Sequence, residues 1–229
     1  MRKMLRFTFS LMAGMMLCLP AQGQDTIMRI KGLRLGVDMS RIAMPILQPG
    51  RSGYEFSADF EAFKNIYPTV HFGRQTLELT KANYRYSSDG SYWRIGFEYN
   101  ALKKIKYDQY EMAFLGFCYG FSRFTQSADS VYISDGHWGD ASFRVLPEDF
   151  KADWVEFTAG VRAELFRNFF IGWYFSGRMM LWHTRNSPMV PIDSPGFGTI
   201  QKHTYLGFNY SVYYRIPLFK ERYITPAKK

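Results

Sequence analysis

Cysteine is scarce in this sequence, whose 229 residues include only Cys18 and Cys118. Cys18 falls in an N-terminal segment with the features of a cleaved export signal, so the mature chain keeps a single thiol. One thiol excludes an intrachain disulfide and a Cys/His metal cage. The stability of the mature chain must therefore come from its non-covalent structure.

Blocks of Lys and Arg that alternate with aromatic residues are also lacking, although the formal net charge is +9. Such blocks are typical of nucleic-acid binding, so no nucleic-acid partner is expected. Removal of the N-terminal segment takes the charge from +9 to +6, because three of its residues are basic and none is acidic. This excess either suits a phosphate-rich lipid surface or is an ordinary surplus of surface Lys and Arg.

Residues 1–23 have the three parts of a secretory signal peptide. Basic residues occur within positions 2–6, an apolar run covers 7–20, and Ala-Gln-Gly at 21–23 is a small-x-small cleavage site. The apolar run is too short for an anchoring helix, and Leu17 stands where a lipoprotein signal has a small residue. We therefore expect cleavage near Gly23, a barrel domain at 24–219 and a basic C-terminal tail at 220–229.

Long hydrophobic runs are absent after residue 23, where no stretch approaches the roughly 20 apolar residues of a membrane helix. Aromatic residues nevertheless make up 18% of the chain. Apolar and polar residues alternate along short segments, as in strands with lipid on one side and a polar interior on the other. Eight such segments are predicted, at 32–40, 54–62, about 69–80, 93–100, 113–122, 155–165, 171–181 and 206–216.

The connections between these segments sort by length onto two sides. Short ones, on the side of the termini, are Lys64–Pro68, Leu102–Asp108 and Arg167–Asn168. Long ones, on the other side, are Ala43–Gly53, Lys81–Gly90, Gln126–Ala152 and Arg185–Lys202. This sorting predicts an all-β fold, an eight-stranded antiparallel transmembrane barrel of the outer membrane with short periplasmic turns and long outer loops.

Aromatic residues at the predicted strand ends indicate interfacial girdles. The outer girdle would contain Tyr54, Trp93, Trp154, Trp182 and Tyr205. The periplasmic girdle would contain Tyr67, Tyr107, Phe166, Phe170 and Phe219.

The segment Tyr92–Asn100, followed by Gly116–Ser122, resembles a family of small outer-membrane β-barrel proteins with a domain of unknown function. OmpA/OmpX-type eight-stranded barrels are its better-known relatives in architecture. The resemblance implies insertion by the outer-membrane assembly machinery, which reads a final strand with alternating apolar residues and a terminal aromatic. Tyr210, Val212, Tyr214 and Phe219 match that signal.

The predicted inward face carries five cations and seven anions. They are Arg34, Asp38, Glu55, Asp59, Glu61, Arg94, Glu98, Glu156, Arg162, Glu164, Arg178 and Arg215. The interior of an eight-stranded barrel is only wide enough for side chains, so these charges predict a plug of ion pairs and hydrogen bonds. The alternative is a proton relay or a narrow gated conduit, because ionisable groups at membrane depth often mark pathways.

Two groups of residues invite an enzymatic or a metal-binding interpretation. A Ser/His/Asp grouping can be drawn from His183, His203, Ser187, Asp193 and Ser194, but no motif fixes these residues relative to one another. A metal site can be drawn from Asp129, Asp135, His137 and Asp140, but their spacing matches neither an EF-hand loop nor a zinc cage. We expect no catalysis, no metal and no cofactor.

The loop Gln126–Ala152 is richer in apolar residues than a purely solvated loop needs to be. It folds over the barrel mouth, extends the strands beyond the membrane, or presents a binding surface. The sequence as a whole predicts a non-catalytic structural or surface-interaction protein of the Gram-negative outer membrane. A small lipid-modifying enzyme and a minor pore are the alternatives. The expected partners are outer-membrane lipids, including lipopolysaccharide, and the oligomeric state is left open.

Overall fold

The computed structural model describes residues 26–102, 110–133, 139, 141–184 and 189–224. The chain divides into two compact units, of which Ile30–Phe219 contains the barrel and the other comprises Met1–Arg29 and Lys220–Lys229. The predicted signal peptide lies outside the described residues. Of the predicted basic tail, residues 220–224 continue the last strand, and the remainder also lies outside the described residues.

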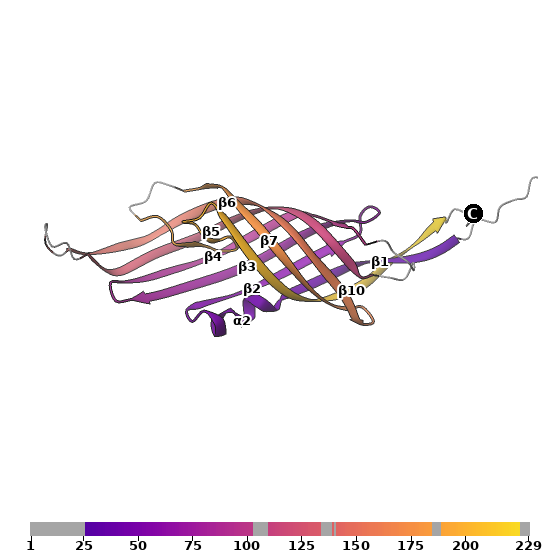
Figure 1. The fold of residues 1–229 in the computed structure, drawn as a ribbon, viewed down its shortest axis with the longest axis horizontal. Coiled ribbons are helices and arrows are strands. Elements are labelled where there is room, and N and C mark those ends of the chain that lie inside the picture. The colour runs from indigo at the N-terminus through magenta and orange to yellow at the C-terminus, as the bar shows by residue number, and fades with distance from the viewer. Residues whose placement is uncertain (1–25, 103–109, 134–138, 140, 185–188, 225–229) are drawn as a thin grey trace, which may run out of the picture. The chain divides into compact units, whose positions relative to one another are not determined.

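Eight strands close into a barrel, which confirms the predicted fold class (Figure 1). Their order around the ring is β1-β10-β7-β6-β5-β4-β3-β2, and seven of the neighbouring pairs have an antiparallel register. The strands are β1 (Thr26–Asp38), β2 (Arg51–Phe60), β3 (Ile66–Lys81), β4 (Tyr84–Asn100), β5 (Met112–Ile133), β6 (Ala141–Phe166), β7 (Phe169–His183) and β10 (Thr204–Ile224).

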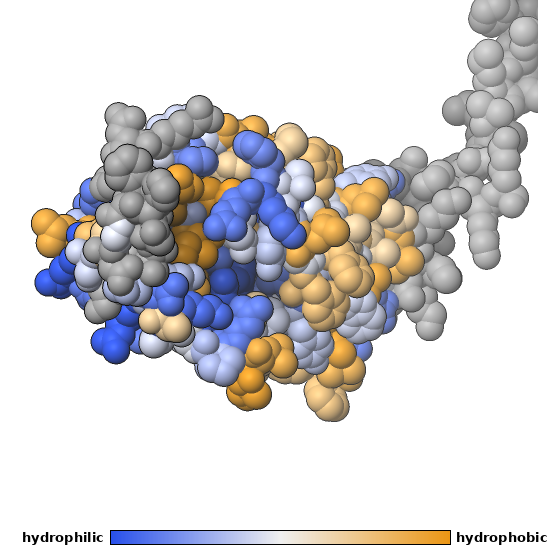
Figure 2. Space-filling model, turned by 60° about the vertical axis from the view of Figure 1, so that its left-hand side comes forward, coloured by the Kyte–Doolittle hydropathy of each residue, from blue (hydrophilic) through white to orange (hydrophobic). Residues whose placement is uncertain are grey.

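Hydrophobic alternation sets which face of each strand points outward, as the sequence predicted. On β4, Ile95 and Phe97 are 54% and 50% exposed, whereas Arg94 and Glu98 are 1% and 3% exposed. Apolar residues gather on the flank of the molecule and hydrophilic residues at the end that comes forward in Figure 2. Among the residues that the structure describes, no helix is long and apolar enough to cross a membrane.

Tight turns join the strands at one end of the barrel, which we call the turn end. Residues 61–65, with a turn at 64–65, connect β2 to β3, and residues 167–168 connect β6 to β7. Asn65 and Asn168 have φ values of 64° and 66°, a left-handed conformation that asparagine tolerates better than most residues. Two of the predicted short connections are therefore confirmed, while most of Leu102–Asp108 lies outside the described residues.

At the opposite end, the hairpin end, two predicted loops prove to be mostly strand. Lys81–Gly90 contains only a two-residue turn at 82–83, and Gln126–Ala152 is largely the outer parts of β5 and β6. The ladder continues there through polar pairs such as Ser87↔Ser127 and Thr125↔Asp149. Hydrophobic alternation fades there because the outward face is polar and the inward face mixes polar Gln126 with apolar Tyr86 and Ala128, so the sequence pattern ended before the strands do.

A helix, α2 (Met39–Leu47), occupies much of the predicted loop Ala43–Gly53 and packs against β2. Met39 and Ser40 were expected at the end of the first strand, and that prediction is wrong. The Asp38 carboxylate accepts hydrogen bonds from the backbone N–H groups of Ser40 and Arg41, at 2.9 and 3.4 Å, and so caps the helix. This capping ends β1 at Asp38.

Three predicted girdle aromatics point into the barrel instead of outward. Trp154 and Phe170 are fully buried and Tyr67 is 7% exposed, because each lies on the inward-facing side of its strand. Tyr205 is half-buried. The outward positions of the other described girdle aromatics are confirmed, namely those of Tyr54, Trp93, Trp182, Phe166 and Phe219. Tyr107 lies outside the described residues.

Candidate functional site: the barrel lumen

A first group of charged residues, the central cluster, surrounds Arg94 on β4. The Arg94 guanidinium donates to the Glu55 carboxylate and, at 2.7 Å, to Glu156. Arg178 approaches the other Glu156 oxygen at 3.3 Å. All four side chains are buried, so every charge in this cluster is opposed by another charge rather than by bulk water.

Neutral and titratable side chains complete the shell of Glu55. The Tyr92 hydroxyl donates to Glu55 at 2.6 Å, and His71 Nδ1 lies 3.2 Å from the other carboxylate oxygen. The Thr69 hydroxyl lies 3.2 Å from His71 Nε2. The Glu55 carboxylate is therefore contacted by Arg94, Tyr92 and His71.

A second group, the turn-end cluster, consists of Arg34, Asp59, Glu98 and Arg162. Arg162 donates two hydrogen bonds to Glu98, at 2.6 and 2.8 Å, and approaches Asp59 at 3.3 Å. Arg34 pairs with the same Asp59 at 2.7 Å. The Arg162 guanidinium also lies over the rings of Phe114 and Tyr213, 4.6 and 4.5 Å from their centres. Aromatic faces stabilise a guanidinium that water does not reach.

The remaining predicted lumen residues lie at the two edges of these clusters. Asp38 accepts from the Asn209 side-chain amide and lies 4.0 Å from Arg41. At the turn end, Arg215 donates to the Asn168 side chain at 3.0 Å. Glu61 and Glu164 accept from the backbone N–H groups of the turn asparagines, at 3.4 and 2.7 Å. Glu164 is only half-buried, so it belongs to the rim of the lumen.

Three charged residues of the lumen were not predicted: Arg41, Arg51 and Asp193. Arg41 reaches inward from α2 to Glu55 at 3.9 Å and donates to Gln75 at 3.1 Å. The Arg51 guanidinium donates two hydrogen bonds to the Asp193 carboxylate, at 2.9 and 3.1 Å. These residues were missed because they lie on a helix and in segments predicted as loops, where strand alternation gives no inward or outward assignment.

Residues 191–200, between β7 and β10, are largely buried and pack inside the barrel at its hairpin end. Within this segment, β8 (Asp193–Ser194) and β9 (Gly198–Thr199) pair as a small separate sheet. Phe197 is fully buried, with its ring centre 6.0 Å from that of Trp154. Its neighbours form one apolar cluster, namely Tyr92, Phe124, Phe150, Ala152, Trp154, Met180 and Ile200.

Glycines on the inward face make room for these large side chains. A Cβ atom at Gly120 would lie 2.2 Å from the Trp154 ring, and one at Gly73 would lie 2.4 Å from the Tyr92 ring. Only glycine therefore fits opposite either ring without displacing it. The aromatic-Gly pattern in the sequence thus reflects the packing of the lumen.

Within the described residues, the imagined Ser/His/Asp grouping makes no contact that indicates catalysis. Asp193 is engaged by Arg51 and Gln75, and the Ser194 hydroxyl lies 2.9 Å from that of Ser122. His183 Nδ1 lies 3.0 Å from a backbone carbonyl oxygen, and His203 is exposed. Ser187 lies outside the described residues.

The described part of the chain also holds no group of three or more His, Cys, Asp or Glu side chains arranged for a metal ion. Asp129 forms an ion pair with Arg144 at 2.5 Å. The other three residues of the imagined metal site, Asp135, His137 and Asp140, lie outside the described residues.

Comparison with known proteins adds a family and weak structural likeness to solved proteins. A search of curated proteins finds no match. Among solved structures, the crystal structure of Neisserial surface protein A (NspA) aligns with 85% of this chain and 100% of its own, at 9% identity and a TM-score of 0.36. That likeness is too low to support an argument. The model of the domain of unknown function DUF6048 matches residues 4–221, so this chain belongs to the DUF6048 family.

Proposed function

We propose that this protein is an integral outer-membrane β-barrel with a closed lumen and a structural or surface-interaction role without catalysis. The observation that carries the proposal is an inverted distribution of burial. Leu206, Phe157 and Ile95 are 85%, 59% and 54% exposed. Arg162, Arg94 and Glu156 are 2%, 1% and 0% exposed.

An apolar outer wall of this kind is unfavourable in water and favourable in lipid. Exposed large apolar residues occur on every barrel strand except β3, well beyond the scattered apolar residues of an ordinary soluble surface. A closed ring of strands also satisfies its backbone hydrogen bonds internally, as the hydrocarbon core requires. The tight turns then belong on the periplasmic side and the long hairpins on the outer side.

The interior supports a structural plug rather than a wide channel. Among the described residues, six arginines and seven carboxylates are buried, and Arg162 on β6 pairs with Asp59 on β2, directly across the ring of strands. The segment 191–200 adds an apolar closure at the hairpin end. Eight-stranded barrels have little room beyond such side chains.

The partners that we propose are outer-membrane lipids around the wall and the assembly machinery during insertion. The last strand supports the second partner, because Tyr210 and Tyr214 point outward and an exposed Phe219 follows them. Alternating apolar residues with a terminal aromatic are the features expected of a strand read for insertion.

Planar-bilayer recording of the purified, refolded protein tests the closed lumen. We expect no large, stable conductance from the intact chain. A variant without residues 191–200 keeps the ion pairs of the two clusters and should also fail to conduct steadily. Large stable conductance from the intact chain would contradict the plug and favour the pore alternative.

A further inference from the structure

Outward-facing side chains on β3 to β6 form rows that cross the sheet. The strand register places Arg74 opposite Ser91, Ser91 opposite Arg123, and Arg123 opposite Lys151. We call these four residues the basic row. Its three cationic residues are exposed and Ser91 is half-buried. Because neighbouring strands lie about 4.8 Å apart, three cations start within roughly 14 Å of one another.

The row lies at a defined depth relative to the apolar wall. On β3, β4 and β5, the residues two positions closer to the turn end than the basic row are all aromatic. They are Phe72, Trp93 and Phe121, and the same register places them opposite one another. The ring centres of Phe72 and Trp93 are 4.6 Å apart, and Trp93 is 41% exposed. Aromatics at a barrel's edge lie at the boundary of the hydrocarbon, and two residues add about 7 Å along a strand. The basic row therefore falls at the level of lipid headgroups.

Two cations of the row face each other without an anion between them. Arg123 and Lys151 are direct cross-strand partners, and neither has an ion-pair partner among the residues that the structure describes. The carboxylates two positions away on β6 are engaged elsewhere, since Asp149 accepts from Thr125 at 2.7 Å and Asp153 interacts with Tyr119. Like charges directly opposite each other destabilise a sheet, and a bound anion would relieve this repulsion.

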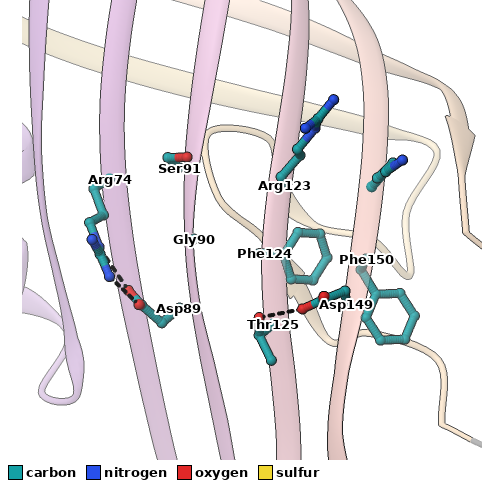
Figure 3. Close-up of a pocket in the computed structure, with 10 residues that line it drawn as sticks. Arg74, Asp89, Gly90, Ser91, Arg123, Phe124, Thr125, Asp149 and Phe150 are labelled. Carbon is teal, nitrogen blue, oxygen red and sulfur yellow. Dashed lines mark hydrogen bonds and ion pairs between the residues drawn. The ribbon is translucent and has the colours of Figure 1, made fainter.

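A hollow of about 430 Å³ lies over the basic row (Figure 3). On one side, Arg74 donates to both Asp89 carboxylate oxygens, at 3.2 and 2.5 Å. The hydrogen bond from Arg74 lowers the pKa of Asp89, so this pair is charged and mutually neutralised at neutral pH. In Figure 3, the Arg123 side chain points away from Asp89 and Asp149. Besides this neutralised pair, the hollow is lined by two cations, Arg123 and Lys151, and one anion, Asp149, so the charge that remains for a ligand is positive.

The geometry points to this hollow as a binding site for the phosphate of a lipid headgroup, held by Arg123 and Lys151 with Ser91 as a hydroxyl donor. The inference rests on the membrane placement proposed above. Phosphate oxygens accept the charge-assisted hydrogen bonds that guanidinium and ammonium groups offer. A free phosphate ion has the same chemistry, but the aromatic row beneath the site favours a phosphate attached to acyl chains.

Binding of defined ligands to the refolded full-length protein in detergent tests the site. Native mass spectrometry would compare diphosphorylated lipid A, its unphosphorylated diacyl-glucosamine analogue and inorganic phosphate. The test variant is Arg123→Gln with Lys151→Gln. The matched control is Lys81→Gln with Arg85→Gln, which removes the same charge from the exposed tip of the β3–β4 hairpin. Heat-dependent electrophoretic mobility is checked first for every preparation.

We expect the test variant to bind lipid A roughly 30-fold more weakly. Each Lys or Arg near an anionic lipid surface contributes about 1 kcal/mol, and the loss of two such contributions corresponds to that factor because about 1.4 kcal/mol changes an affinity tenfold. The control should bind as the original chain does. Equal loss in both variants, or unchanged binding in the test variant, would overturn the site. Inorganic phosphate binding as tightly as lipid A would refute a lipid source. A chain that fails to form a heat-modifiable barrel would instead count against the proposed function itself.

Discussion

Replacing Arg94 by Met removes the cation that two buried carboxylates share. Glu55 and Glu156 both pair with Arg94, and all three side chains are at most 3% exposed. Breaking a buried ion pair by removing one partner costs about 3–5 kcal/mol, because the remaining charge is left uncompensated. Glu156 keeps Arg178 at 3.3 Å, and Glu55 keeps Arg41 at 3.9 Å. We therefore expect Arg94→Met to lower the free energy of unfolding by about 3 kcal/mol, the lower end of that range.

The assay is reversible urea unfolding of the refolded barrel in detergent micelles, followed by tryptophan fluorescence. The control is Arg144→Gln, which breaks the exposed pair with Asp129 and should cost at most about 0.5 kcal/mol. The double variant Arg94→Met with Glu156→Gln should lose less stability than the two single variants lose when their losses are added, since the two residues interact directly. Equal stability of Arg94→Met and Arg144→Gln would refute the reasoning that the lumen charges are mutually compensated.

Two further predictions concern the packing of the lumen and its closure. Gly120→Ala should destabilise the barrel by about 1–3 kcal/mol in the same urea assay, because its Cβ would meet the Trp154 ring at 2.2 Å. Gly177→Ala is its control, since the nearest atom to that Cβ is 3.8 Å away, and a similar loss there would contradict the packing argument. Asp193→Asn should speed amide hydrogen exchange in 191–200 about tenfold, because it weakens the paired hydrogen bonds from Arg51. Unchanged exchange would show that the segment is held without this contact.

Most of the barrel could be predicted from the sequence because the outward face of each strand is mainly apolar and its inward face is mainly polar. The inward positions of Arg94, Glu98 and Arg162 followed from alternation alone. Alternation ended where the outward face becomes polar, so the parts of β5 and β6 near the hairpin end were taken for a loop.

The inward fold of residues 191–200 could not be predicted in the same way. Proline, glycine and serine around Phe197 indicate a loop, and nothing in a loop pattern separates one that points outward from one that folds inward. The inward fold depends on long-range contacts, such as Asp193 with Arg51 and Gln75. Arg41 was missed for a related reason, because Asp38 starts a helix where strand alternation appeared to continue.

The measurement that tests the central claim most directly is membrane fractionation of cells that express the full chain, followed by electrophoresis with and without boiling. The account predicts recovery in the outer-membrane fraction and faster migration of the unboiled protein, because a closed barrel with a charge-paired lumen resists detergent. Recovery as a soluble periplasmic protein with no heat-dependent shift would contradict the lipid-facing assignment of the outer wall.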